Sequence, residues 1–93
     1  MMKVKDLKVG IKVDEILLQI TRKGDTRAFA GKTEGTVCNT DAKDEDDNVI
    51  GLTLWNTDIN KYDVDDVVKV TEGRVTEFNN KLQISGRLEL FKA

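Results

Sequence analysis

Five short runs rich in valine, isoleucine, leucine and threonine, separated by Gly, Asp and Asn, constrain this chain more than any other feature. Such residues favour strands, and the helical spacing of apolar residues is weak throughout. The pattern predicts strands over residues 11–22, 36–43, 49–55, 67–78 and 81–90. Because 93 residues can enclose only one hydrophobic core, we expect residues 1–93 to form one all-β domain.

The segments between these runs indicate how the strands are connected. Residues 23–35 are typical of a flexible connection, residues 44–48 of a solvated acidic hairpin tip, and residues 79–80 of a two-residue hairpin turn. Residues 56–66 interrupt the strand pattern and predict one short helix. Five strands with a helix between the third and fourth match the OB-fold, a five-stranded Greek-key barrel. An SH3-like barrel is the structural alternative, although it would not need this interruption.

Two positions within the predicted strands favour β-bulges. The apolar alternation of the first strand slips near Asp14 and Glu15, and Gly73 interrupts the fourth strand. A bulge bends a strand so that it can serve both halves of a closed barrel, which agrees with the predicted fold.

The chain has no histidine and a single cysteine, Cys38. One cysteine cannot form an intrachain disulfide, and we expect Cys38 to be a small buried side chain. Without histidine, zinc ligation and most acid–base or nucleophilic arrangements lose their usual partners, so we do not expect an enzyme. The acidic residues 41–48 lack the spacing, central glycine and closing glutamate of a calcium-binding loop.

The sequence shows no membrane or export signal. No apolar run approaches the roughly 20 residues that cross a bilayer. Residues 1–12 alternate lysine with valine and leucine, which is not the continuous apolar region of a signal peptide. We therefore expect a cytoplasmic protein.

The formal net charge of −2 conceals an uneven distribution. Residues 1–40 carry eight basic and five acidic residues, whereas residues 41–66 carry two basic and nine acidic residues. Residues 67–93 again have a basic excess, with five against three. If the acidic middle stretch lies away from the binding surface, the rest of the molecule can still attract phosphates.

The alternation of the third strand places its tryptophan on the outer face. Ile50, Leu52 and Leu54 form one aliphatic stripe, so Thr53 and Trp55 fall on the opposite side. An indole there can stack on a nucleobase. The alternative is that Trp55 covers a barrel end or packs against the short helix.

The fourth and fifth strands add positive charge to the same face. Arg74, Thr76 and Phe78 point outward in the fourth strand, where Phe78 could instead pack on the hairpin and Arg74 could pair with a neighbouring glutamate. In the fifth strand the side chains predicted to face inward are Leu82, Ile84, Leu88 and Leu90, and those predicted to face outward are Lys81, Gln83, Ser85 and Arg87. Aromatic surface combined with positive charge is what single-stranded nucleic-acid binders need.

The predicted first connection and its flanks supply further candidate phosphate contacts, namely Arg22, Lys23, Arg27 and Lys32. Phe29 lies in the same segment. It could be a stacking residue carried by the loop or a plug in the mouth of the barrel, and we favour the plug.

Three segments carry a family resemblance: LTLW at residues 52–55, YDVDDVVKV at residues 62–70 and EGRVTEFNNKLQI at residues 72–84. In these the chain resembles the OB domains of archaeal replication protein A, and it is also similar to the crenarchaeal single-stranded DNA-binding proteins. The similarity extends over about residues 4–90, and LTLW and the FNNKLQI hairpin are its most specific parts.

The resemblance implies an OB-fold that binds single-stranded DNA in replication, repair and recombination, with no cofactor. It implies that Trp55 stacks on a base at the end of the third strand and that Phe78 is a second aromatic near the hairpin. Some relatives have a further aromatic where this chain has Arg74, so one stacking contact is missing or is replaced by guanidinium stacking. The turn at residues 44–48 is also longer than is usual in the family.

Three functions remain open at this stage. The first is binding of single-stranded DNA by stacking and phosphate contacts. The second is a protein-interaction or inter-domain module of a replication protein A complex, favoured by the acidic middle stretch. The third is RNA binding, because stacking and phosphate contacts serve both polymers. Since a lone OB domain contacts few nucleotides, we expect this domain to belong to a longer protein with linked binding domains.

Overall fold

The computed structural model describes residues 2–92 of the chain. Its elements are the 3-10 helix η1 (Val4–Asp6), β1 (Lys12–Phe29), β2 (Gly35–Lys43), β3 (Val49–Trp55), α1 (Asp58–Lys61), β4 (Val67–Phe78) and β5 (Lys81–Leu90). The last three strands have the bounds that the sequence predicted, and β2 begins one residue earlier than predicted.

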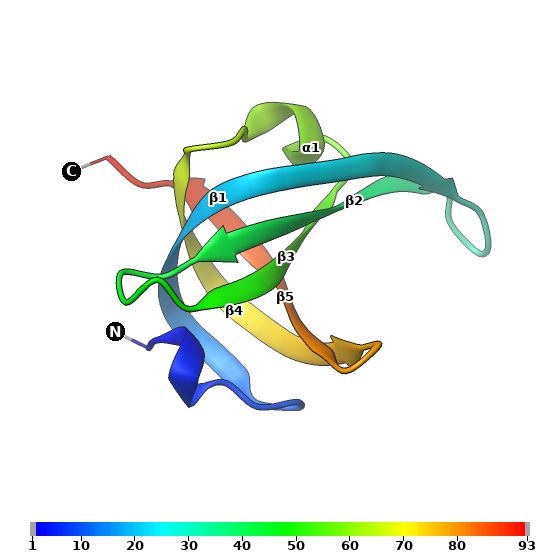
Figure 1. Cartoon of the computed structure of the whole chain (residues 1–93). Helices are drawn as coiled ribbons and strands as arrows, with labels where there is room; N and C mark the ends of the chain where they lie inside the picture. The colour runs from blue at the N-terminus through cyan, green and yellow to red at the C-terminus, as the bar shows by residue number, and fades with distance from the viewer. Residues whose placement is uncertain (1, 93) are drawn as a thin grey trace.

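The five strands close into one barrel in the order β1-β2-β3-β5-β4 (Figure 1). β1 is antiparallel to both β2 and β4. The barrel closes where β3 meets β5 in a short parallel pair, at Gly51↔Gln83 and Leu52↔Ile84. With α1 between β3 and β4, this is the Greek-key OB-fold predicted from the sequence.

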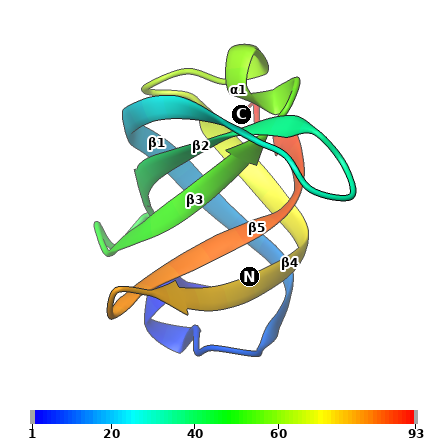
Figure 2. The ribbon, with the colours of Figure 1, turned by 90° about the vertical axis from the view of Figure 1, so that its right-hand side faces the viewer.

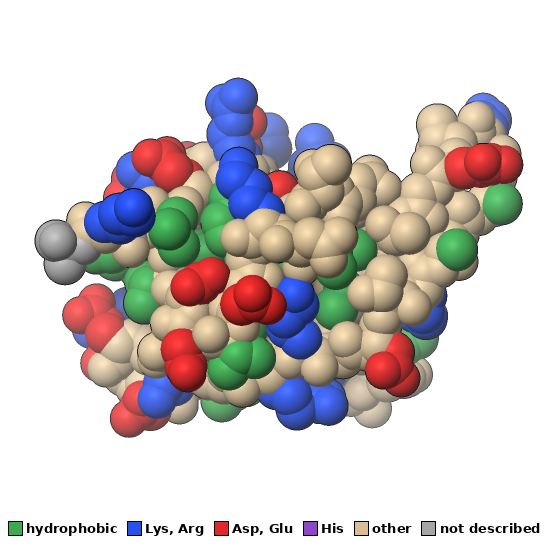
Figure 3. Space-filling view, turned by 90° about the horizontal axis from the view of Figure 1, so that it is seen from above, with side chains coloured by type: hydrophobic (Ala, Val, Ile, Leu, Met, Phe, Trp, Pro, Cys, Tyr) green, Lys and Arg blue, Asp and Glu red, His purple; other side chains and the backbone are tan. Residues whose placement is uncertain are grey.

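β1 is longer than predicted, and it carries part of the predicted flexible connection. It continues through residues 23–29, which pair with β2 up to Phe29↔Gly35. The register shifts at Gly24, where a Cβ atom would lie 2.9 Å from the carbonyl oxygen of Asn39, so glycine allows the two strands to approach. The last part of β1 and the start of β2 therefore form an arm that projects from the barrel (Figure 3).

One of the two predicted bulges is present. β4 shifts register against β5 between Thr71 and Arg74, and Glu72 has a left-handed φ of 51°, so the bulge predicted at Gly73 is confirmed. The bulge predicted at residues 14–15 was wrong, because β1 and β4 stay in one register on both sides of it. Val13 and Ile16 are nevertheless both buried, and this point of β1 pairs with the bulged part of β4, where Val13 lies opposite Gly73.

The core fills the inside of the barrel with aliphatic side chains from every strand. Ile50, Leu52 and Leu54 of β3 are at most 1% exposed, as their alternation predicted. The fifth strand deviates at its end, because Leu90, predicted to face inward, is 41% exposed. The ladder shift opposite Gly86 and the end of the strand explain why strict alternation fails there.

α1 and the residue after it cover one end of the barrel (Figure 1). Ile59 and Tyr62 are buried, and the Tyr62 hydroxyl donates a 3.0 Å hydrogen bond to the carbonyl oxygen of Leu88. The ammonium of Lys23 donates to the carbonyl oxygens of Ile59 at 2.5 Å and Tyr62 at 3.0 Å. A cation therefore joins β1 to the C-terminal end of α1, where carbonyl oxygens lack partners.

The other end of the barrel is closed by the N-terminal segment, which Asp44 fastens to the β2–β3 turn. The Asp44 carboxylate accepts hydrogen bonds from the backbone N–H groups of Val4 at 2.8 Å, Asp46 at 3.0 Å and Asn48 at 3.1 Å. Asp44 is only 5% exposed. The prediction of a wholly solvated acidic tip was therefore wrong for this residue, because backbone donors replace water around its charge.

Among residues 2–92, no helix has the length and apolar character needed to cross a membrane.

Candidate nucleic-acid interface

A shallow groove of about 290 Å³ crosses the outer face of the barrel over β2, β3, β5 and the end of β4. Figure 2 looks onto this face, where β3 and β5 run side by side between β2 and β4. The residues that line the groove are Arg27, Val37, Asn39, Thr53, Trp55, Thr76, Phe78 and Gln83. Four of the residues singled out from the sequence as a nucleic-acid site therefore meet here, namely Arg27, Trp55, Phe78 and Gln83.

Trp55 lies at the end of β3 with 44% of its surface exposed, on the face opposite the buried aliphatic stripe. The next residue, Asn56, has a left-handed φ of 53° and ends the strand. Its backbone N–H donates to the carbonyl oxygen of Thr36 at 2.9 Å, and its side-chain oxygen accepts from the Thr36 N–H at 3.0 Å. These two bonds fix the backbone directly after Trp55 against β2.

Phe29 packs against Trp55 instead of plugging the barrel, so the plug interpretation was wrong. The two ring centroids lie 5.6 Å apart at an interplanar angle of 87°, an edge-to-face arrangement. Gly35 makes this contact possible, because a Cβ atom there would lie 2.7 Å from the Phe29 ring and 2.5 Å from the side-chain oxygen of Asn56. The arm of β1 and β2 therefore supports the indole from one side.

Phe78 provides the second aromatic surface of the groove. It ends β4, pairs with Lys81 across the hairpin and is 67% exposed. The two turn residues, Asn79 and Asn80, have left-handed φ values of 52° and 63°, as a two-residue hairpin turn requires. Because two thirds of the Phe78 surface faces solvent, packing on the hairpin does not account for this residue.

Gln83 lies in the middle of the groove floor, where its carboxamide covers Gly51 of the neighbouring strand. A Cβ atom on Gly51 would collide with the Gln83 amide, so a larger residue at this position would displace that side chain. The side-chain oxygen of Gln83 is buried and has no hydrogen-bond donor among the described residues. Burying an acceptor without a donor is unfavourable, so this position of the Gln83 amide carries a free-energy cost.

Arg22 and Lys81, two of the predicted phosphate contacts, share one carboxylate beside the groove. Lys81 Nζ lies 2.5 Å from one oxygen of Asp41, and Arg22 Nε lies 3.0 Å from the other. The hydrogen bonds from Lys81 and then Arg22 hold the pKa of the Asp41 carboxyl below its ordinary value. Part of the acidic stretch therefore lies at the candidate site instead of away from it.

The remaining predicted contacts lie outside the groove lining. The ammonium of Lys23 is occupied by the carbonyl oxygens at the end of α1, and its side chain is 20% exposed. Lys32 is exposed in the turn between β1 and β2, and Arg87 is exposed in the second half of β5. Arg74 faces outward next to Lys12 of β1, its partner in the β1–β4 ladder, and lines two other depressions there.

The sequence reasoning did not identify Val37 and Asn39 as part of the site. Both lie on the outer face of β2, where they pair with Trp55 and Thr53 of β3. Their position could have been predicted from the pairing of the two strands, because the acidic turn at residues 44–48 joins two strands of similar length. Counting back from that turn pairs residue 39 with residue 53.

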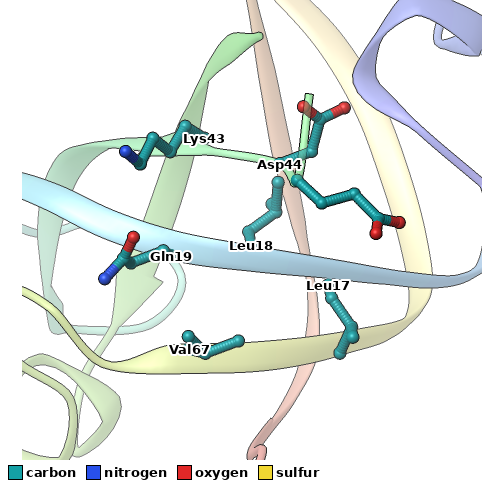
Figure 4. A pocket seen from close by; sticks show the side chains of 7 residues that line it. Leu17, Leu18, Gln19, Lys43, Asp44 and Val67 are labelled. Carbon is teal, nitrogen blue, oxygen red and sulfur yellow. The ribbon is translucent and has the colours of Figure 1, made fainter. Parts of the chain in front are cut away.

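A second depression lies between β1, β4 and the β2–β3 turn (Figure 4). Leu17, Gln19 and Val67 line one side of it, and Lys43 and Asp44 line the other. It contains no aromatic residue on which a base could stack. The groove with Trp55 and Phe78 is therefore the better candidate site.

Comparison with known proteins supports the fold. No protein-family model matches the sequence, and no curated protein matches it. Among solved structures, the chain is similar to the second OB-fold domain of replication protein A from Methanococcus maripaludis, determined by solution NMR, with a TM-score of 0.80 and 22% sequence identity. The match covers 99% of this chain and 95% of that domain. The OB-fold therefore spans nearly the whole chain.

Proposed function

We propose that this domain binds single-stranded DNA without catalysis, through the groove between Trp55 and Phe78. The observation that carries the proposal is the presence of two exposed aromatic side chains in one groove on the outer face of an OB barrel. Each base has an apolar face, and stacking on an aromatic side chain contributes about 1–3 kcal/mol per base.

The polar groups around the aromatics suit a flexible, charged strand. Arg27 lines the groove itself, and Arg22 and Lys81 lie beside it. The cations attract backbone phosphates, while Gln83, Asn39 and Thr53 offer hydrogen bonds to bases that stack. The likeness to an archaeal replication protein A domain supports a role in DNA replication, repair and recombination.

The test is a fluorescence titration with oligo-dT at low salt. The chain contains one tryptophan, so its emission reports only on Trp55. We expect saturating oligonucleotide to quench the emission, and the affinity to fall steeply as salt rises, because bound phosphates release counterions. Unchanged emission and anisotropy at saturating oligonucleotide and low salt would contradict the proposal.

Two variants separate stacking at the groove from a general loss of structure. Trp55→Ala, followed by the anisotropy of labelled oligonucleotide, should weaken binding by about 10- to 100-fold, which corresponds to the loss of one stacked base. Val49→Ala is the matched control, because Val49 is 60% exposed on the same face of β3 but does not line the groove. This variant should bind like the wild type.

A second candidate function is a protein-interaction or inter-domain module. It is favoured by Leu90 and Phe91, which are 41% and 40% exposed. The Phe91 N–H donates to the carbonyl oxygen of Val67, the residue that follows the acidic connection of residues 63–66. On this interpretation the domain would not bind oligonucleotides and would co-elute with sister domains in size-exclusion chromatography. Phe91→Ser should then abolish co-elution and leave the groove unaffected.

The choice between DNA and RNA is a further part of the proposal. Stacking on Trp55 and Phe78 does not discriminate between the polymers, because only contacts to the 2′-hydroxyl do so. Parallel titrations with oligo-dT and oligo-U measure this preference directly. Since a lone OB domain contacts few nucleotides, we also propose that linked domains in a longer protein provide the affinity required in the cell.

A further inference from the structure

Asp41 occupies a central position between the two cations beside the groove. It lies on the outer face of β2, two residues from Asn39 of the groove lining. Each carboxylate oxygen of Asp41 contacts a different cation, with Lys81 Nζ at 2.5 Å and Arg22 Nε at 3.0 Å. The three side chains come from β2, β5 and β1, so they converge only in the folded barrel.

The cluster spans β3 at Gly51. β3 lies between β2 and β5, and Gly51 pairs with Asp41 on one side and with Gln83 on the other. A side chain at residue 51 would stand in the space that the Gln83 carboxamide fills. Lys81, two residues before Gln83 in β5, reaches across β3 to the Asp41 carboxylate.

The exposure of the three side chains shows which of them a ligand can reach. The side chains of Arg22 and Lys81 are 72% and 49% exposed, whereas that of Asp41 is 23% exposed. A carboxylate and a phosphodiester both accept charge-assisted hydrogen bonds from such cations. Because exposed ion pairs contribute little to stability, the two cations can exchange one anion for another at low cost.

We propose that Asp41 is an internal competitor for a backbone phosphate: it holds Arg22 and Lys81 at the groove in the free protein, and a phosphate of the bound strand takes them over. This inference rests on the proposed function. In the free domain Asp41 cancels part of the positive charge beside the aromatics. It therefore lowers the affinity for any polyanion and leaves stacking on Trp55 and Phe78 to decide which ligands bind.

The experiment compares the wild type with Asp41→Asn and Asp65→Asn, by oligo-dT anisotropy at several salt concentrations. Asp65 is the matched control, because it is exposed, has no ion pair among the described residues and has a left-handed φ that asparagine tolerates. Asp41→Asn should bind about fivefold more tightly at low salt. Its plot of log affinity against log salt should be steeper by up to about one, because in the wild type the released Asp41 carboxylate takes up a salt cation, which offsets part of the counterion release.

The outcomes separate this inference from the proposed function. A gain for Asp41→Asn beyond that of Asp65→Asn, which disappears when Lys81→Gln is added, supports the inference. Equal binding by the two variants overturns it, and so does weaker binding by Asp41→Asn, because Asp41 would then position the cations for the ligand. If neither the wild type nor Asp41→Asn binds oligonucleotide, the proposed function fails, and this inference fails with it.

Discussion

Asp41 and Asp44 lie three residues apart in the acidic stretch, but they have different partners. Asp41 lies on the outer face and contacts two side-chain cations, whereas Asp44 is buried and accepts three backbone N–H groups. Both carboxyl groups have a lowered pKa. The comparison indicates that the kind of partner, and not the charge, decides whether an acidic residue pairs with exposed cations or fastens the backbone.

The largest effect expected to test this comparison is a loss of protein stability when Asp44 is replaced. Asp44→Ala leaves three N–H groups without their acceptor and detaches the N-terminal segment at Val4. We expect the free energy of unfolding to fall by about 3 kcal/mol, measured by urea denaturation. Oligonucleotide affinity at a temperature where the variant is folded should stay unchanged, and a parallel loss of affinity would undermine the contrast.

Phe78→Ala should have a smaller effect, on binding alone. The ring is 67% exposed, so its removal should change the free energy of unfolding by less than about 0.5 kcal/mol. Oligo-dT affinity should fall about tenfold, because one stacking surface of the groove is lost. Anisotropy and urea denaturation of the same preparation measure both quantities. A stability loss larger than the binding loss would instead favour packing on the hairpin.

Acid titration should distinguish the two carboxylates further. Burial by itself raises the pKa of Asp44, but the N–H groups of Val4, Asn48 and Asp46 outweigh it, so the folded-state pKa lies below the ordinary value of 3.8. The stabilisation is therefore complete above about pH 4 and is lost as the pH falls through the lower folded-state pKa. Urea denaturation at several pH values should show this loss for the wild type and a weaker pH dependence for Asp44→Asn.

The smallest effect should be that of Asp41→Asn on stability. Its partners are exposed side chains, so the free energy of unfolding should change by less than about 1 kcal/mol. Salt at 1 M should remove even this difference, because the screening length is then about 3 Å. A salt-resistant loss of stability comparable to that of Asp44→Ala would show that the two carboxylates stabilise the fold in the same way.

Local patterns in the sequence predicted most of the barrel. The alternation of Ile50, Leu52 and Leu54 was sufficient to place Trp55 on the outer face, because side-chain direction within one strand is a local property. The Asn79-Asn80 turn was equally predictable, because few residue types adopt two successive left-handed conformations.

Contacts between distant segments were not predictable in the same way. Lys23 donates to the carbonyl oxygen of Tyr62, which lies 39 residues further along the chain. Asp44 accepts from the N–H group of Val4, which lies 40 residues before it. Such contacts depend on how the strands cross in three dimensions, which residue order alone does not specify. The interpretation of Phe29 failed for a related reason, because the length of β1 depends on its pairing with β2.

The short parallel pair of β3 and β5 has a mechanical consequence. Backbone pairing closes the barrel wall there only at Gly51↔Gln83 and Leu52↔Ile84. The ion pair from Lys81 of β5 to Asp41 of β2 spans this seam on the outer face. Because an exposed ion pair contributes little to stability, withdrawing Lys81 from Asp41 should leave the barrel wall closed. Amide hydrogen exchange along β5 should therefore be the same in the wild type and in Asp41→Asn.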